Sequence, residues 1–101
     1  MNKIINGKLY DTETAKKVGC YDNGYDCENF HYFYEALYLK KTGEWFLYGE
    51  GGPMSDYSEP YGSGWMGIRK IMPYTEAEAK RWAARHLNAD KYMEHFGKVD
   101  E

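Results

Sequence analysis

The sequence predicts an α+β fold in which an antiparallel sheet of about four to five short strands carries C-terminal helices on one face. Its 101 residues suit a single domain spanning residues 1–101. Short stretches rich in aromatic and β-branched residues, separated by Gly-containing turns, fill most of residues 1–72. Residues 75–97 instead combine helix-capping signals with a helical spacing of apolar residues.

The first residues predict a β-hairpin followed by a short helix. Asn6-Gly7 lies between two apolar pairs, and both residues tolerate the positive φ of a type I′ turn. Asp11 or Thr12 can cap a helix of one or two turns within residues 11–19, which Gly19 can end. The polar residues 20–29 are predicted to form a loop.

The centre of the chain predicts a second hairpin, formed by residues 35–41 and 44–49. Residues 30–41 fit a helical stripe or a strand, but the short turn before residues 44–49 favours pairing with that strand. We therefore expect residues 30–34 to extend the first strand. Residues 49–65 are predicted to form one long ordered loop, with a helical turn near residues 53–57.

The last third predicts a strand and two helices. Residues 66–72 fit a strand that Pro73 ends. Thr75 and Glu78 have the spacing of a capping box, and the helix that follows should run to about residue 87. Asn88 begins a second helix that Gly97 ends. Trp82 should anchor both helices on one sheet face, leaving the other face open with exposed tyrosines.

Composition and charge favour a binding protein. The chain holds 11 Tyr, a side chain suited to surfaces that are both wet and adhesive. A net charge of −3 argues against direct, nonspecific binding to nucleic acid. Residues 1–62 hold 10 acids and 6 bases, or −4, which suits either a basic protein partner or a solvated surface. No apolar run approaches a membrane span and no signal peptide is evident, so we expect a cytoplasmic protein.

Two further clusters are candidate sites of chemistry. Cys20 and Cys27 lack the tight spacing of a zinc pair, so we expect no metal and no cofactor, and whether the two thiols pair stays open. The segment Gly49-Glu50-Gly51-Gly52-Pro53 is like a phosphate loop, but Glu50 would repel phosphate and no Lys-Ser/Thr follows. Because no nucleophile–base pair is visible, we do not expect an enzyme.

The most suggestive stretch is residues 54–65, where aromatic and acidic side chains alternate. Aromatic anchors with acidic neighbours suit a basic protein groove, although the same residues could cap the core. With Glu50 and similar residues of the loop at 22–26, they form the predicted partner-binding set: Glu50, Asp56, Tyr57, Glu59, Tyr61, Trp65, Asp22, Tyr25 and Asp26.

Three segments carry a family resemblance. They are Leu9-Tyr10-Asp11-Thr12-Glu13-Thr14-Ala15, residues 41–55 with Lys41-Thr42-Gly43-Glu44 leading into Tyr48-Gly49-Glu50-Gly51-Gly52-Pro53, and residues 71–79. Together they resemble a family of short proteins of bacterial genomes, phages and integrated elements. Small proteins of this kind are similar to anti-CRISPR and other anti-defence inhibitors.

The resemblance implies a phage or mobile-element protein in the cytoplasm of a bacterial host. Its partner would be a protein, foremost a CRISPR effector nuclease whose basic nucleic-acid groove it occupies. Two alternatives stay open. One is a nucleotide or small-molecule binder using the loop at residues 49–53, and the other is a structural protein–protein interaction module whose open sheet face self-associates.

Overall fold

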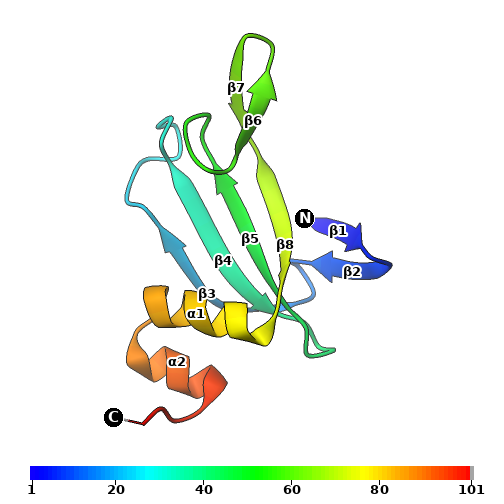
Figure 1. The fold of residues 1–101 in the computed structure, drawn as a ribbon, viewed down its shortest axis with the longest axis vertical. Coiled ribbons are helices and arrows are strands. Elements are labelled where there is room, and N and C mark those ends of the chain that lie inside the picture. Colours follow the sequence, from blue (N-terminus) through cyan, green and yellow to red (C-terminus); the bar gives the residue numbers. More distant parts are fainter. Residues whose placement is uncertain (101) are drawn as a thin grey trace.

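The computed structural model describes residues 1–100, which form eight strands and two helices (Figure 1). The strands are β1 (Asn2–Ile5), β2 (Lys8–Asp11), β3 (Lys16–Asp22), β4 (Phe33–Leu39), β5 (Trp45–Gly51), β6 (Ser58–Tyr61), β7 (Gly64–Gly67) and β8 (Arg69–Tyr74). The helices are α1 (Glu76–His86) and α2 (Ala89–Phe96). An antiparallel main sheet has the order β3-β4-β5-β8, and β1–β2 and β6–β7 are separate hairpins. The predicted α+β class with C-terminal helices is confirmed.

One face of the main sheet packs against the two helices. Alternate residues of β4 and β5 point to this face, among them Leu37 and Leu47, which are almost completely buried. Trp82 of α1 lies over them and is only 7% exposed, which confirms it as the anchor of the helices. The alternation follows from the two-residue period of a strand, which separates the residues of the two faces.

Both helices begin and end where the capping signals predict. Thr75 accepts a hydrogen bond from the Glu78 amide at 3.1 Å, and Glu78 accepts one from the Thr75 amide at 2.9 Å. Asn88 caps α2 through the Lys91 amide, and Gly97 follows its last turn at φ 85°. Neither helix within residues 1–100 has the length and apolar character needed to cross a membrane.

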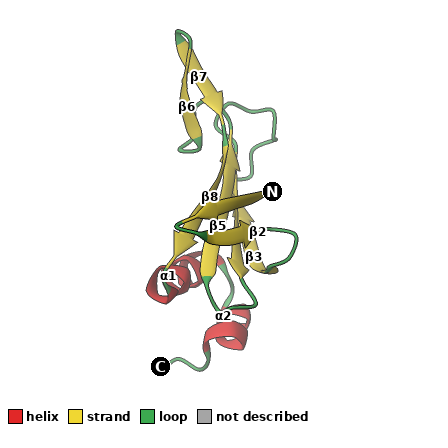
Figure 2. Cartoon of the chain, turned by 90° about the vertical axis from the view of Figure 1, so that its right-hand side faces the viewer, coloured by secondary structure: helices red, strands yellow, loops and turns green. Residues whose placement is uncertain are grey.

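The second face of the sheet is partly covered, which corrects the expectation that it stays open. Hairpin β1–β2 crosses in front of the sheet in Figure 2 and places Tyr10 against this face. The Tyr10 ring meets Phe46 edge-on, with 5.6 Å between centroids, and is 6% exposed. Tyr38 of β4 is buried beside them, stacked on Phe46 at 5.1 Å.

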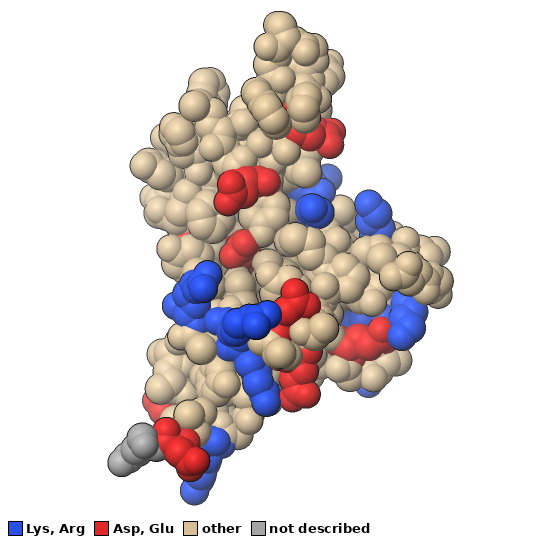
Figure 3. Space-filling view, in the orientation of Figure 1, with Lys and Arg blue, Asp and Glu red and all other residues tan. Residues whose placement is uncertain are grey.

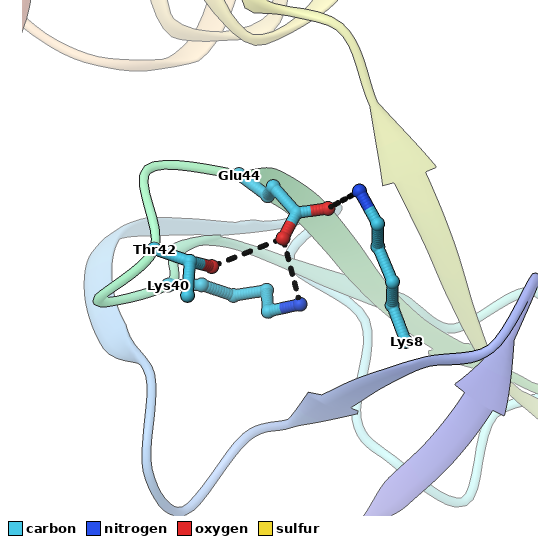
Figure 4. Close-up of polar contacts among 4 residues, drawn as sticks. All are labelled: Lys8, Lys40, Thr42 and Glu44. Carbon is cyan, nitrogen blue, oxygen red and sulfur yellow. Dashed lines mark hydrogen bonds and ion pairs between the residues drawn. The ribbon is translucent and has the colours of Figure 1, made fainter.

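Polar contacts centred on Glu44 also hold hairpin β1–β2 in place, through its strand β2 (Figure 4). Glu44 accepts from Lys8 of β2 at 3.1 Å, from Lys40 at 3.1 Å and from the Thr42 hydroxyl at 3.0 Å. These bonds hold the pKa of Glu44 down at about 2, with the Lys8 hydrogen bond as the largest cause. Lys40 also lies over the Tyr10 ring, 4.2 Å from its centroid.

The helix predicted over residues 11–19 is wrong. Only one turn forms, closed by the Ala15 amide on the Asp11 carbonyl at 3.1 Å, and β3 begins directly after it. Val18 is buried in the helix-side core, and a bulge at Val18 turns Gly19 to the same face. Burial of this strand against α1 therefore outweighs the local capping signal.

Three further predictions are also wrong. Residues 49–65 are not one loop with a helical turn, because β5 continues to Gly51 and residues 58–67 form hairpin β6–β7. Pro73 does not end a strand but lies inside β8, paired with Phe46. Strand β8 is an edge strand, where a missing N–H is tolerated. Residues 30–32 form a turn before β4 rather than part of it.

Candidate protein-binding surface

Three segments meet at the end of the main sheet that lies away from the helices (Figure 1). They are residues 22–32, residues 52–57 and hairpin β6–β7, and we call their common exterior the distal surface. The first two are joined by the Met54 amide, which donates to the Phe30 carbonyl, and by the Gly52 amide, which donates to the Tyr32 carbonyl, each at 2.8 Å. Hairpin β6–β7 is joined to residues 52–57 at its base, where the Ile68 amide donates to the Tyr57 carbonyl at 3.0 Å, so the three segments are connected.

Large apolar side chains are exposed over the whole distal surface. Trp65 and Tyr61 of hairpin β6–β7 are 60% and 70% exposed, although both are costly to leave in water. The complete set comprises Tyr25, Phe30, Met54, Tyr61, Trp65 and Met66. Such a concentration of aromatic and Met side chains is typical of the centre of a protein–protein interface.

The charge of the distal surface has one sign. Neither residues 18–39 nor residues 45–68 contain a Lys or Arg. The exposed carboxylates of these stretches belong to Asp22, Asp26, Glu28, Asp56 and Glu59. Figure 3 shows an acidic patch and no basic side chain near the top of the face it draws; basic side chains begin below that patch, and others gather over α1. The distal surface therefore presents an unbalanced negative potential.

A hydrogen-bonded cluster fixes the base of this surface to the helices. Glu35 of β4 accepts from the Tyr57 hydroxyl with one carboxylate oxygen and from Trp82 Nε1 at 2.9 Å with the other. Burial, and then the bond to Glu35, raises the pKa of Tyr57, so the hydroxyl stays protonated as the donor. Gly49 makes room for the Tyr57 ring, because a Cβ there would lie 2.2 Å from it.

Two shallow pockets flank Met54 on the distal surface. One, of about 350 Å³, lies between residues 22–33 and residues 54–56, and Tyr25, His31 and Asp56 form its walls. The other, of about 290 Å³, is lined by Met54 together with Pro53 and Trp65. Pockets of this kind can receive individual side chains of a partner.

The structure places seven of the nine predicted partner-binding residues on the distal surface with exposed side chains. They are Asp22, Tyr25, Asp26, Asp56, Glu59, Tyr61 and Trp65. Tyr57 is instead only 8% exposed, with its ring against Gly49 and its hydroxyl donating to Glu35, so it supports the surface and is not part of it.

Glu50 is the other member of the predicted set that is not an exposed part of the distal surface. Its carboxylate accepts from the Tyr48 hydroxyl at 2.6 Å and the Tyr32 hydroxyl at 3.3 Å, on the sheet face opposite the helices. Burial, followed by the negative charge of Glu50, raises the pKa of Tyr32 to about 12. Glu50 is therefore committed to contacts within the protein.

The sequence interpretation missed several members of the distal surface: Phe30, Met54, Met66 and Glu28. Phe30 was assigned to a strand, so its exposure could not be anticipated. The absence of basic residues from two long stretches, 18–39 and 45–68, was the available signal, because β4 and β5 bring those stretches to the same end of the sheet.

Two other candidate sites are already occupied by contacts within the protein. The Gly51 amide donates to Ile68 O at 3.3 Å and the Gly52 amide to Tyr32 O, so the loop at residues 49–53 lacks these donors for an anion. A pocket of about 390 Å³ beside hairpin β1–β2 contains Glu44, whose carboxylate is already paired with two lysines. Cys20 and Cys27 are free and exposed.

Comparison of this chain with protein-family models, with curated proteins and with solved structures finds no match.

Proposed function

We propose that this protein acts by binding, and that its distal surface docks onto a cationic surface of another protein. One observation carries the proposal: exposed aromatic side chains and five exposed carboxylates share a surface whose two sequence stretches, 18–39 and 45–68, contain no Lys or Arg. Aromatic side chains supply affinity at an interface, while carboxylates choose a partner of opposite charge and speed the encounter.

The most suitable target is a groove that normally holds nucleic acid. Such a groove presents Lys and Arg to phosphates and flat surfaces to bases. On the distal surface, carboxylates such as Asp56 and Glu59 would stand in for phosphates, and Tyr61 and Trp65 for bases. The resemblance to mobile-element proteins makes a CRISPR effector nuclease the first candidate, with this protein as its cytoplasmic inhibitor.

The nucleotide-binding alternative has less support. It requires free backbone amides in residues 49–53, whereas Gly51 and Gly52 donate to carbonyl groups of the chain and Pro53 has no amide hydrogen. The self-association alternative requires an open sheet face, and hairpin β1–β2 covers part of that face with Tyr10.

The test is binding to immobilised effector nucleases, with and without guide RNA, at increasing salt. We expect the double variant Tyr61→Ala/Trp65→Ala to bind at least about thirtyfold more weakly, since a central aromatic anchor contributes about 2 kcal/mol or more. Affinity should also fall as salt rises, because exposed charges are screened.

A matched control comes from the other hairpin. Ile4 and Leu9 are 71% and 51% exposed and lie opposite each other on β1–β2, so Ile4→Ala/Leu9→Ala removes a similar apolar pair elsewhere. This control should bind like the unmodified protein. Equal loss in both double variants, or binding that is indifferent to salt, would refute docking through the distal surface.

A further inference from the structure

The pocket between residues 22–33 and residues 54–56 has features beyond those of a general apolar contact. Its volume of about 350 Å³ lies in the range of small-ligand sites, roughly 300–1,000 Å³. Its lining joins three aromatic rings, a flexible apolar side chain and one carboxylate: Tyr25, His31, Phe33, Met54 and Asp56, completed by Asn23 and Ser55.

The aromatic walls are held in position by the loop itself. The Asn23 side chain donates to the His31 carbonyl at 2.8 Å and accepts from the Phe33 amide at 3.2 Å. The Tyr25 and His31 rings lie 6.2 Å apart, and the Phe33 ring is supported by Tyr21 at 5.9 Å. The backbone that carries His31 and Phe33 is thus fixed without a partner, which lowers the entropic cost of filling the pocket.

The carboxylate of the pocket is unused within the described residues. Between residues 1 and 100, Asp56 makes no side-chain hydrogen bond and no ion pair. Two neighbouring acids differ, since Asp22 accepts from the Gly24 amide and Asp26 from the Glu28 amide. Residues 18–39 and 45–68, which build the pocket, bring no Lys or Arg to neutralise Asp56.

We infer that this pocket receives an arginine side chain of the partner, with the guanidinium group against the aromatic walls and paired with the Asp56 carboxylate. A planar guanidinium can stack on aromatic rings and still donate two parallel hydrogen bonds to a carboxylate. A lysine ammonium has no flat face to stack and is more strongly hydrated, so it fits the pocket less well. The inference rests on the proposed function and specifies how the distal surface recognises a cationic partner.

The test uses the protein alone and a small probe, Nα-acetyl-L-arginine amide, added while amide chemical shifts are followed by NMR. We expect saturable shifts centred on Tyr25, His31 and Asp56, with a dissociation constant that is roughly millimolar. The corresponding citrulline amide keeps the shape but lacks the charge, and should shift these signals at least about fivefold less at equal concentration. The lysine amide should fall between the two.

Variants assign the effect to the pocket. Asp56→Asn should weaken arginine-amide binding at least about fivefold, because a charge-assisted bond becomes a neutral one. Glu94→Gln removes an exposed carboxylate of α2, outside both the pocket lining and the distal surface, and should leave the constant unchanged. Equal shifts from citrulline amide, shifts centred elsewhere, or an unaltered constant in Asp56→Asn would overturn the inference.

The outcome is separable from that of the proposed function. Loss of effector binding in Tyr61→Ala/Trp65→Ala without arginine-amide binding to the pocket would keep docking at the distal surface and reject the arginine contact. Arginine-amide binding to the pocket, together with unimpaired effector binding by Tyr61→Ala/Trp65→Ala, would keep the arginine contact and reject docking at the distal surface.

Discussion

The two small hairpins of this protein have similar backbones and opposite uses. Each pairs two four-residue strands around a turn that contains a positive-φ Gly. On β1–β2 the strand residue Tyr10 is 6% exposed and inserted against the sheet, whereas on β6–β7 the strand residue Tyr61 is 70% exposed. Hairpin β1–β2 crosses the sheet and β6–β7 projects beyond it (Figure 2).

The comparison shows that the role of a hairpin tyrosine depends on whether its ring packs against the sheet. A two-stranded hairpin is marginally stable alone, so each must be held by the rest of the protein. Hairpin β1–β2 is held by side chains, namely Tyr10 and the Lys8–Glu44 ion pair. Hairpin β6–β7 is held at its base by backbone contacts, including Ile68 N to Tyr57 O at 3.0 Å, which leaves its side chains free to face a partner.

The largest expected effect is the difference in stability between replacing Tyr10 and replacing Tyr61. Tyr10→Ala should lower the free energy of unfolding by about 3–5 kcal/mol, because it opens a cavity beside Phe46. Tyr61→Ala should change it by no more than about 0.5 kcal/mol, as for other exposed positions. Urea denaturation at neutral pH measures both. Similar values for the two variants would show that the hairpins do not differ in this way.

A smaller effect should come from the base of β6–β7. A Cβ on Gly67 would lie 2.0 Å from the Gly51 carbonyl oxygen, a backbone atom that cannot rotate away. Gly67→Ala should therefore destabilise the protein by about 1–3 kcal/mol and shift the hairpin. Gly64→Ala, in the same strand, meets nothing within 4 Å and serves as its control. Thermal denaturation of Gly67→Ala and Gly64→Ala tests this expectation. Equal melting temperatures for the two variants would contradict the close approach of the backbone at Gly67 to that at Gly51.

The smallest effect concerns the ion pair that holds β1–β2. The pKa of Glu44 is lowered from 4.5 to about 2 in the folded protein, so the unfolded chain binds a proton first as pH falls. The stabilisation is therefore complete above about pH 4.5 and disappears as the pH falls toward 2. Glu44→Gln should flatten the stability profile in this window, measured by urea denaturation at several pH values.

The exposed Glu59 of β6 provides the counterpart on the other hairpin. Glu59→Gln should leave the acid limb of the stability profile unaltered, since no hydrogen bond or ion pair of the Glu59 side chain occurs within the described chain. A flatter limb in both variants would mean that general charge repulsion, and not the Lys8–Glu44 pair, sets the acid stability.

Local signals predicted the elements whose formation depends on neighbouring residues. Asn6 and Gly7 have φ values of 51° and 76°, as the predicted hairpin requires, and Thr75 and Asn88 cap their helices as expected. Hairpin β4–β5 was also predicted correctly, because a short turn leaves its flanks no alternative to pairing.

Elements that depend on distant residues could not be predicted. Residues 16–22 become a strand because Val18 packs under α1, and Gly19 lies under Leu87 from the far end of the chain. Tyr57 had the same local features as Tyr61, yet the partner that buries it, Glu35, lies 22 positions earlier. The aromatic and acidic character of the candidate site was visible in sequence, but its division into surface and support was not.

The carboxylate of Glu35 limits how the distal surface could be transferred to another protein. This carboxylate of β4 accepts from Tyr57 in a turn of the distal surface and from Trp82 in a helix, so it joins three parts of the chain. A graft of residues 52–67 onto a foreign sheet would bury the Tyr57 hydroxyl without an acceptor, at a cost of about 1–3 kcal/mol. A transferable version has to carry a carboxylate and an indole donor with it.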